Sequence, residues 1–310
     1  MHNFNWFITR LKRGLGQPRT ILYYLFILSP TDHIPDERFL KQLFWLKMGK
    51  PLNLDDPKTF NEKLQWLKLH NRRPEYTTMV DKYAVKQLVA DQIGEEYVVP
   101  VYGLYRSFDE IDPDALPEQF VLKCTHDSGG LVICKDKSTL DWAAARKKLE
   151  KSLSKNCYLP GREWPYKDVP PRILAEKYLA TSPDAPSESL PVYKFFCFNG
   201  EPRIVQVIMN DKRSNETVDY YDMNWQHLQI RQGYPNSSTP LSPPPAFRQM
   251  QKLSQILCGA QPFLRVDWYD YNGQAMFSEF TFYSDSGFCE FDPTEMDAKL
   301  GEQICLDNLH

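Results

Sequence analysis

The chain has 310 residues, of which 42% are hydrophobic and 14% aromatic, so it can build the core of one large or two modest globular domains. This composition excludes a disordered or a fibrous protein. There are 37 basic and 40 acidic residues, a formal net charge of -3, which argues against a protein that coats nucleic acid. The cysteines number 7, are scattered and never form CxxC, so they fit neither a disulfide framework nor a zinc ribbon. We therefore expect a cytoplasmic protein with no nucleic-acid partner.

Residues 1–31 differ from the rest of the chain because they contain no acidic residue. Their apolar and aromatic side chains are accompanied by four basic ones, namely Arg10, Lys12, Arg13 and Arg19. The apolar run over 21–28 is too short to span a bilayer, which takes about 20 residues, and no good signal-peptidase site follows it. Two interpretations remain open. The segment is either a helix that lies on the inner face of an anionic membrane or a helix packed on the core with its cations in solvent.

Helix and strand signals alternate along the rest of the chain. Thr59 and Glu62 form a capping box that opens a helix reaching His70, and further helices are expected over 81–93 and 138–155. Short β-branched or aromatic runs predict strands over 120–124, 131–134, 172–178, 192–198, 203–208, 263–270 and 274–282. Asn-Gly pairs at 199–200 and 272–273 indicate hairpins, and proline-rich stretches at 182–187 and 235–245 indicate loops. Hairpins mixed with helices predict an α+β fold.

The hairpin over 263–282 carries charged residues whose direction depends on the turn. A two-residue turn would put Asp267 and Glu279 on opposite faces. A three-residue loop over 271–273 instead pairs Arg265 with Glu279 and leaves the other face apolar, so we prefer it. This register brings the two carboxylates within reach of one ion, and their hard oxygens suit magnesium held together with nucleotide phosphates. The plain alternative is a solvated ladder of surface charges.

Two lysines stand inside apolar strands, where a charge needs a partner. Lys123 precedes the loop 125–130, whose Gly129-Gly130 pair would let backbone N–H groups wrap phosphates. The loop is no Walker motif, since GxxxxGK[ST] is absent. Lys194 stands in an alternating strand. An edge lysine beside a hairpin turn and an outward-facing strand position are the alternatives for these two residues.

The order of these features resembles the ATP-grasp fold. More narrowly, the segments 59–66, 80–85, 121–130, 161–167, 193–200 and 265–281 are similar to the TupA-like ATP-grasp proteins of surface-polysaccharide biosynthesis. The resemblance covers about residues 45–290 and implies two α+β subdomains that clasp ATP. It divides the chain into a helical N-terminal extension (1–58), the first part of the core (59–118), a small subdomain with the phosphate loop (119–180) and a C-terminal subdomain with the metal site (181–310).

The resemblance also implies roles for individual residues. The phosphates of ATP would be held by Lys82, Lys123, Lys194, His126, Ser128, Gly129 and Gly130. Adenine would meet the hinge residues Glu176, Lys177, Tyr178 and Leu179, and either Asp184 or Glu188 would take the ribose hydroxyls. Magnesium would be held by Asp267, Glu279 and Thr281, and Arg265 would stabilise the transition state. The sugar substrate would contact Arg162, Trp164, Tyr166 and Lys167, unless these residues form a loop packed by its own aromatic rings.

The chain departs from the family pattern at a few positions. Thr125 and Asp127 replace the asparagine and first glycine of a loop that usually reads Asn-His-Gly-Ser-Gly-Gly, and Asp127 adds negative charge near the phosphates. Thr281 stands where many ATP-grasp enzymes have asparagine.

The implied activity is ATP- and magnesium-dependent ligation of a carboxylate to an amine through an acyl phosphate. The expected partners are a uronic acid of a surface polysaccharide or lipid-linked glycan and an amino acid or small amine. One alternative is a glycosyltransferase, although the only DxD sequence is Asp112-Pro113-Asp114 in an acidic loop. The other is a non-catalytic, membrane-associated subunit that binds nucleotide.

Overall fold

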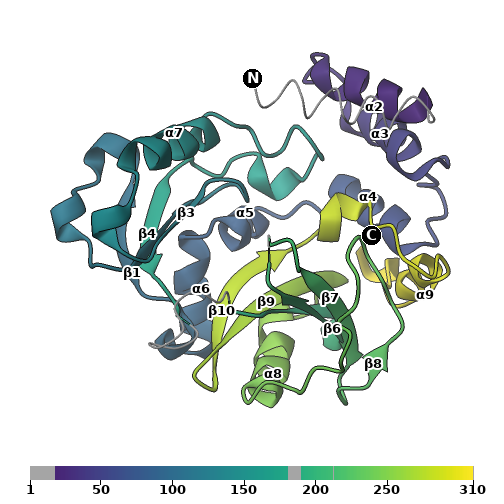
Figure 1. Cartoon of the computed structure of the whole chain (residues 1–310). Helices are drawn as coiled ribbons and strands as arrows, with labels where there is room; N and C mark the ends of the chain where they lie inside the picture. The colour runs from purple at the N-terminus through teal and green to yellow at the C-terminus, as the bar shows by residue number, and fades with distance from the viewer. Residues whose placement is uncertain (1–17, 181–189, 212, 310) are drawn as a thin grey trace.

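The computed structural model describes residues 18–180, 190–211 and 213–309, which form two antiparallel sheets with helices around them (Figure 1). The four-stranded sheet has the order β1-β4-β2-β3, and the six-stranded sheet has the order β10-β9-β5-β6-β7-β8. This arrangement of antiparallel sheets and helices is the α+β class expected from the sequence.

The small sheet consists of β1 (Val101–Tyr105), β2 (Phe120–Cys124), β3 (Leu131–Cys134) and β4 (Ile173–Lys177). The helix α7 (Trp142–Leu153) packs on it, and Phe120 and Leu122 are buried in the same cluster as Leu149 of α7. Because side chains alternate along a strand, Lys123 points to the other face of the sheet.

The large sheet consists of β5 (Val192–Phe198), β6 (Glu201–Met209), β7 (Thr217–Asp222), β8 (His227–Leu228), β9 (Phe263–Tyr271) and β10 (Gln274–Thr281). The helix α8 (Phe247–Cys258) covers one face, as Figure 1 shows. Phe195 stacks on Phe247 with ring centroids 5.9 Å apart, and the indole of Trp268 donates to the Ser254 hydroxyl at 2.8 Å. The residues that alternate with Phe195 and Trp268 therefore face away from α8.

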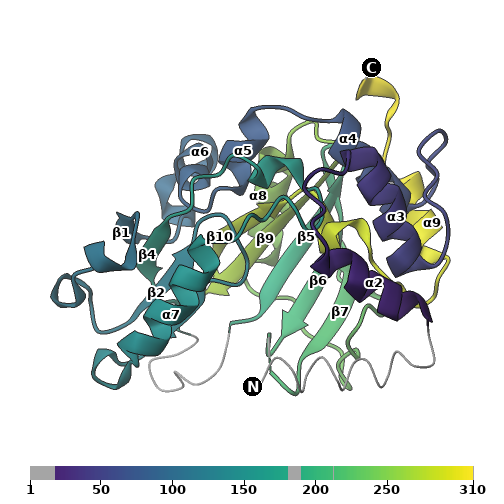
Figure 2. The same ribbon diagram turned by 90° about the horizontal axis from the view of Figure 1, so that it is seen from above.

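The remaining α-helices lie around the two sheets. They are α2 (Pro18–Leu28), α3 (Asp36–Met48), α4 (Phe60–His70), α5 (Glu75–Val80), α6 (Ala84–Ile93) and α9 (Met296–Glu302). Phe60 of α4 packs on Phe196 and Phe263 of the large sheet. Viewed from above, the pair α2–α3 and the helix α7 lie on opposite sides of the molecule, with strands of the large sheet between them (Figure 2).

Several predicted elements are confirmed to the residue, including β2, β3, β5 and the helix α4 with both hydrogen bonds of its capping box. Two predicted helices begin later than expected. The helix expected from residue 81 begins at Ala84 because the Asp81 carboxylate accepts hydrogen bonds from the backbone of Tyr83 and Ala84. The helix expected from residue 138 begins at Trp142, after Asp141 acts as its N-cap.

The β9–β10 hairpin corrects the predicted register. Its turn has two residues, Asn272 and Gly273, both with positive φ, so the three-residue loop is wrong. The register then shifts between Phe277 and Glu279, where β10 has one extra residue. Asp267 is thus paired with Glu279, and Arg265 is opposite Thr281 instead of Glu279. The bulge returns the two carboxylates to one face of the sheet.

Candidate functional site

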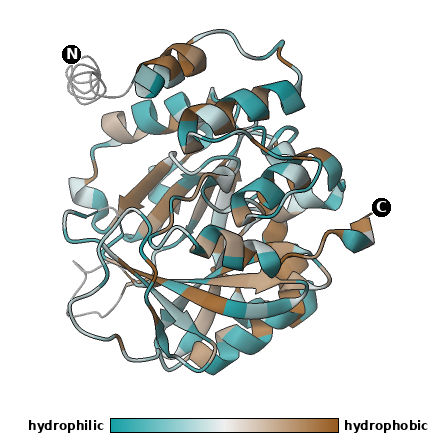
Figure 3. Cartoon of the chain, turned by 90° about the vertical axis from the view of Figure 1, so that its right-hand side faces the viewer, coloured by the Kyte–Doolittle hydropathy of each residue, from teal (hydrophilic) through white to brown (hydrophobic). Residues whose placement is uncertain are grey.

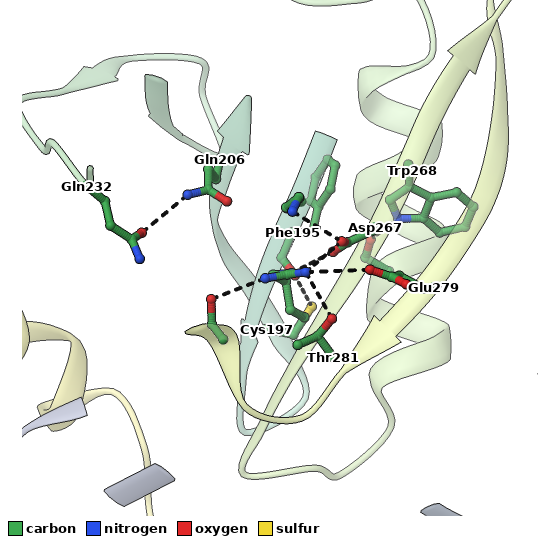
Figure 4. Close-up of polar contacts among 12 residues, drawn as sticks. Phe195, Cys197, Gln206, Gln232, Asp267, Trp268, Glu279 and Thr281 are labelled. Carbon is green, nitrogen blue, oxygen red and sulfur yellow. Dashed lines mark hydrogen bonds and ion pairs between the residues drawn. The ribbon is translucent and has the colours of Figure 1, made fainter. Parts of the chain in front are cut away.

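A row of polar side chains crosses the large sheet on the face away from α8. Glu279 pairs with Asp267, Asp267 with Lys194, Lys194 with Gln206, and Gln206 with Tyr220. Residues directly opposite each other on neighbouring strands point to the same side. The five side chains therefore form one line across β10, β9, β5, β6 and β7, charged at one end and neutral at the other. Figure 4 shows this face of the sheet.

Arg265 lies beside the charged end of this row, where Asp267, Thr281 and Ser284 hold its guanidinium. Its Nε and Nη2 donate to the two oxygens of Asp267, each at 2.8 Å, while other donors reach the hydroxyls of Thr281 at 2.9 Å and Ser284 at 3.2 Å. Glu279 Oε1 is 3.9 Å from Nη2. Burial lowers the pKa of Arg265, but the charge of Asp267 outweighs burial and raises it. Arg265 is thus a permanent cation in a fixed orientation.

Glu279 is the more accessible of the two carboxylates, since its side chain is 34% exposed against 2% for Asp267. The ammonium of Lys82 is 3.7 Å from Glu279 Oε2, and that of Lys194 is 3.8 Å from Asp267 Oδ2. Burial raises the pKa of Glu279, but the surrounding lysines and Arg265 outweigh it and lower the pKa. Glu279 is therefore an anion at neutral pH.

The predicted magnesium ligands fit that ion in part. Glu279 presents a carboxylate, whereas each oxygen of Asp267 and the hydroxyl of Thr281 already accept a hydrogen bond from Arg265. Within the described parts of the chain, no group of three or more His, Cys, Asp or Glu is arranged to hold a metal. Magnesium commonly takes one or two carboxylates and completes its shell with water and phosphate oxygens, which suits Glu279 together with the remaining lone pairs of Asp267.

On the small sheet, Lys123 does not stand alone. Its ammonium is 2.5 Å from Glu176 Oε1, and that of Lys86 is 3.1 Å from Glu176 Oε2. Burial raises the pKa of Glu176, but the two lysines outweigh burial and lower it. Burial lowers the pKa of Lys86 to about 8. Lys86 was not predicted from the sequence, because its partner Glu176 is distant along the chain. The roles expected for Lys123 and Glu176 toward nucleotide stay predictions.

The loop 125–130 is tied to the C-terminal end of α7 by Asp127. The carboxylate accepts from the backbone of Gly130 at 2.9 Å and from the Ser152 hydroxyl, and it lies 3.3 Å from the Lys155 ammonium. The negative charge expected near phosphate is therefore directed at α7, where it shapes the loop.

The other loop residues are divided between the interior and the surface. His126 is buried, with Nε2 at 3.2 Å from the Ser152 carbonyl, while Ser128 and Gly129 at the tip are exposed. Lys82 donates to the Asp127 carbonyl at 2.8 Å and also faces Glu279, so it joins the loop to the large sheet.

We expect Asp127→Asn to lower the free energy of unfolding by about 1–3 kcal/mol, because one amide cannot accept from all three donors. Burial raises the pKa of Asp127, but the hydrogen bonds from Ser152, Gly130 and Lys155 outweigh it and lower the pKa. The stabilisation is therefore present above the ordinary carboxyl range and is lost as pH falls through the lowered pKa. Urea unfolding at several pH values measures the effect. Asp109→Asn is the control, because that side chain is 74% exposed. Equal stability of the two variants would contradict a stabilising role for the contacts of Asp127.

The segment 161–167 corrects one predicted substrate contact. Arg162 is 1% exposed, with Nη1 donating to the Leu159 carbonyl at 3.0 Å and Nη2 to that of Thr31 at 2.5 Å. Its Nε is 3.2 Å from Asp36, and the guanidinium lies 4.1 Å from the Phe39 ring. A sugar cannot reach it there, so the expectation that Arg162 contacts substrate is wrong. It anchors the segment on α3.

The other members of this segment have different surroundings. Trp164 and Tyr166 pack partly buried against the main core, and Lys167 is exposed with its ammonium 5.6 Å from the Tyr158 ring. Their contact with substrate stays a prediction. Glu163 is half-buried, and burial raises the pKa of its carboxyl.

The expected adenine hinge lies at the end of β4. Lys177 ends β4 and its backbone N–H donates to the Pro100 carbonyl at 2.9 Å, while Tyr178 and Leu179 follow the strand. The two candidates for ribose, Asp184 and Glu188, lie outside the described residues. Adenine binding at this hinge stays a prediction.

Comparisons with known proteins give one family. A family model described as TupA-like ATPgrasp matches residues 62–305. Among solved structures, the D-alanine–D-alanine ligase of Bacillus anthracis complexed with ATP is 15% identical, with a TM-score of 0.39 over 66% of this chain and 54% of that one. The corresponding ligase of Helicobacter pylori is 13% identical, with a TM-score of 0.41 over 79% and 69%. D-cycloserine synthetase DcsG is 12% identical, with a TM-score of 0.40 over 74% and 71%.

This chain thus spans only 54% of the length of the Bacillus anthracis ligase. A search of curated proteins finds no match. The family model, by contrast, covers most of the chain and agrees with the ATP-grasp fold expected from the sequence. The chain belongs to the TupA-like ATP-grasp family.

Proposed function

We propose that the protein is an ATP- and magnesium-dependent ligase that joins a uronic acid of a surface polysaccharide, or of its lipid-linked precursor, to an amino acid or small amine. The observation that carries this proposal is the charged end of the polar row, where Lys194, Arg265 and Lys82 surround Asp267 and Glu279 on one sheet face. Cations fixed around two carboxylates suit the transfer of a phosphoryl group, whose charge must be spread over several partners.

In the proposed reaction, the substrate carboxylate attacks the γ-phosphate of ATP and ADP departs. Lys82 and Lys194 neutralise the charge of the transferring phosphoryl group, and Glu279 with Asp267 would hold magnesium, which when bound supplies further neutralisation. The resulting acyl phosphate is attacked by the amine. Arg265 then faces the oxyanion that develops on the former carboxylate carbon, and inorganic phosphate leaves.

The test is the release of ADP by the full chain supplied with magnesium-ATP, glucuronic or galacturonic acid, and a panel of amino acids and ammonium. We expect release only when a uronic acid and an amine are both present. Glucose and galactose, which lack the carboxylate, are the matched controls. ADP release that ignores either substrate would overturn the proposal. Thermal stabilisation by nucleotide sugars alone would favour a glycosyltransferase, and ATP binding without turnover would favour a non-catalytic subunit.

We also propose that α2 brings the enzyme to an anionic membrane surface, where lipid-linked glycans are assembled. No residue of α2 is buried, and Leu22, Leu25 and Leu28 are 46%, 62% and 68% exposed. Their spacing of three places them on one stripe of the helix. The side of α2 that carries Phe26 packs on α3, with the ring centroids of Phe26 and Phe39 5.2 Å apart. Figure 3 shows apolar positions on this helix at the edge of the molecule.

The basic composition of residues 1–31 supports an anionic surface as the partner of this stripe. None of the helices in the described part of the chain is long and apolar enough to cross a membrane. We expect the triple variant L22S/L25S/L28S to lose at least about tenfold in sedimentation with phosphatidylglycerol vesicles, because each leucine would bury apolar area in the membrane. Ile256→Ser, at a 46% exposed position of α8, is the control. Equal sedimentation of both variants would contradict the proposal.

A further inference from the structure

Asp285 is an exposed acidic residue that follows directly after a contact of Arg265. Ser284 is buried, and its hydroxyl accepts from Nη1 of Arg265 at 3.2 Å. The next residue along the chain, Asp285, is exposed to solvent. Because consecutive Cα atoms are only about 3.8 Å apart, the turn places an accessible carboxylate one position away from the guanidinium contact.

The turn that carries Asp285 is strained and held in place. Asp285 and Ser286 have φ values of 45° and 55°, a left-handed conformation that costs about 1–3 kcal/mol for each residue that is not glycine. Gln65 donates to the carbonyls of Ser286 at 3.0 Å and Gly287 at 2.7 Å, and the Lys68 ammonium donates to the Ser286 carbonyl at 2.8 Å. Both donors come from α4, so this helix fixes the position of the turn.

The carboxylate of Asp285 is oriented but keeps an unpaired negative charge. The side-chain amide of Gln232 donates to Oδ2, and the Cys289 thiol lies 3.5 Å from the same oxygen. Of the residues that the structure describes, none donates a hydrogen bond to Oδ1 and none forms an ion pair with Asp285. The second oxygen is therefore available to a ligand that donates hydrogen bonds.

The neutral end of the polar row determines how Gln232 directs its amide. Gln206 donates from Nε2 to the Tyr220 hydroxyl at 2.6 Å and to Gln232 Oε1 at 3.3 Å (Figure 4), and the Tyr220 hydroxyl donates to the same Oε1. Gln232 thus uses its oxygen toward the row, which leaves its NH2 group for Asp285. The polar row and the turn after Arg265 together hold the Asp285 carboxylate in one orientation.

A carboxylate in this place suits the positively charged group of the second substrate. Three cations already surround Asp267 and Glu279, and they repel an ammonium that approaches the acyl phosphate. Neither of those two carboxylates is free to offset this repulsion. Both oxygens of Asp267 accept from Arg265, and Glu279 lies 3.7 Å from the Lys82 ammonium. Asp285 has no such partner.

We propose that Asp285 binds the ammonium group of the amine substrate. The ammonium donates to Oδ1, and the carboxylate offsets its charge close to the cations that hold the phosphoryl group. Because Asp285 is exposed, the proton that the ammonium loses before it attacks the acyl phosphate passes to water. This role rests on the proposed ligase function, since it requires an amine as the second substrate.

The experiment compares Asp285→Asn with the wild type in the full chain, using magnesium-ATP, a uronic acid and two acceptors of similar size. Ammonium carries a charge, whereas hydroxylamine is largely uncharged at neutral pH. We expect KM for ammonium to rise about 10–100-fold in the variant, the usual effect of losing a hydrogen bond between charged groups. The KM values for hydroxylamine, ATP and the uronic acid should stay within about twofold.

The variant and its control are matched in structure. Asparagine tolerates the left-handed conformation, so Asp285→Asn retains the turn. Asp91→Asn on α6 is the control, because Asp91 is also exposed and also accepts from a glutamine amide, that of Gln87 at 2.8 Å. It should leave KM for ammonium at the value of the wild type.

The outcomes separate the two proposals. A wild type that forms neither amide nor hydroxamate overturns the ligase function and the role of Asp285 with it. A wild type that forms hydroxamate but no amide, or an Asp285→Asn variant with an unchanged KM for ammonium, overturns the role of Asp285 alone. An equal rise of KM for ammonium, ATP and the uronic acid gives Asp285 a structural role and also overturns the proposal.

Discussion

Replacing Arg265 with lysine is expected to lower kcat for ADP release by about 10²–10³-fold, the usual effect of removing one preorganised oxyanion donor. Arg265 binds Asp267 with two parallel hydrogen bonds and reaches Thr281 and Ser284 with its other donors. A lysine keeps the charge but has a single ammonium, so it cannot hold Asp267 at both oxygens and face the reacting group in the same orientation. Steady-state kinetics with magnesium-ATP, uronic acid and amine measure the change.

A matched control separates this effect from the general effect of replacing an arginine with lysine. Arg203 on β6 is 55% exposed and pairs with Glu201 at 2.5 Å, so Arg203→Lys should leave kcat within about twofold. Calorimetric binding of ATP by Arg265→Lys establishes that the variant is folded. A folded Arg265→Lys protein with the kcat of the wild type would remove Arg265 from the catalytic machinery.

The sequence correctly predicted those helices and hairpins whose ends are fixed by residues close by in the chain. The capping box at Thr59 and the Asn199-Gly200 turn fix their elements through contacts a few residues apart, so α4 and the β5–β6 hairpin follow the prediction. Local reading failed where a competing cap lay nearby, as with Asp141 and α7. It also overlooked α3, α5, α8, α9 and the strands β1, β7 and β8, which depend on packing partners distant in sequence.

The predicted face of the two carboxylates is correct, but the predicted turn of the β9–β10 hairpin is wrong. The prediction that Asp267 and Glu279 share a face required a three-residue turn, whereas the chain combines a two-residue turn with a bulge at Ser278. A three-residue turn and a two-residue turn with a bulge each shift the pairing by one residue. Because side chains alternate with a period of two, both place Glu279 on the same face as Asp267. They differ for Arg265, which is opposite Thr281. Side-chain alternation alone cannot locate a bulge within a strand that is apolar on one face.

The substrate segment illustrates a second limit of sequence reading. Arg162 and Glu163 are neighbours, but Arg162 has a positive φ and is 1% exposed, whereas Glu163 is half-buried. The residue types at 161–167 do not indicate which of these two charged side chains is buried. The distinction depends on Asp36 and Lys68, which come from two other helices.

We expect Glu176→Gln to lower the free energy of unfolding by about 3–5 kcal/mol, because it leaves two buried lysines without a counter-charge. The side chains of Lys86, Lys123 and Glu176 are only 11%, 16% and 8% exposed, so water replaces little of the lost interaction. Urea unfolding monitored by tryptophan fluorescence measures the change. Glu150→Gln removes an exposed pair with Arg146 on α7 and should cost no more than about 0.5 kcal/mol.

The difference in free energy of unfolding between the wild type and Glu176→Gln should depend on pH. A packing defect would not give this dependence. Glu176 has a lowered pKa although burial raises it, so its contribution in the wild type is present above the ordinary glutamate range and is lost as pH falls through that pKa. Burial lowers the pKa of Lys86 to about 8, below its value of about 10.4 in the unfolded chain, so the folded state gains stability as pH rises between them. In the variant Lys86 loses the anion that raises its pKa, and this gain begins at lower pH. The destabilisation by Glu176→Gln should therefore be largest on the acid side of neutrality, above the Glu176 pKa, and shrink both in acid and as pH rises toward 8, whereas a cavity or packing defect would give a difference independent of pH.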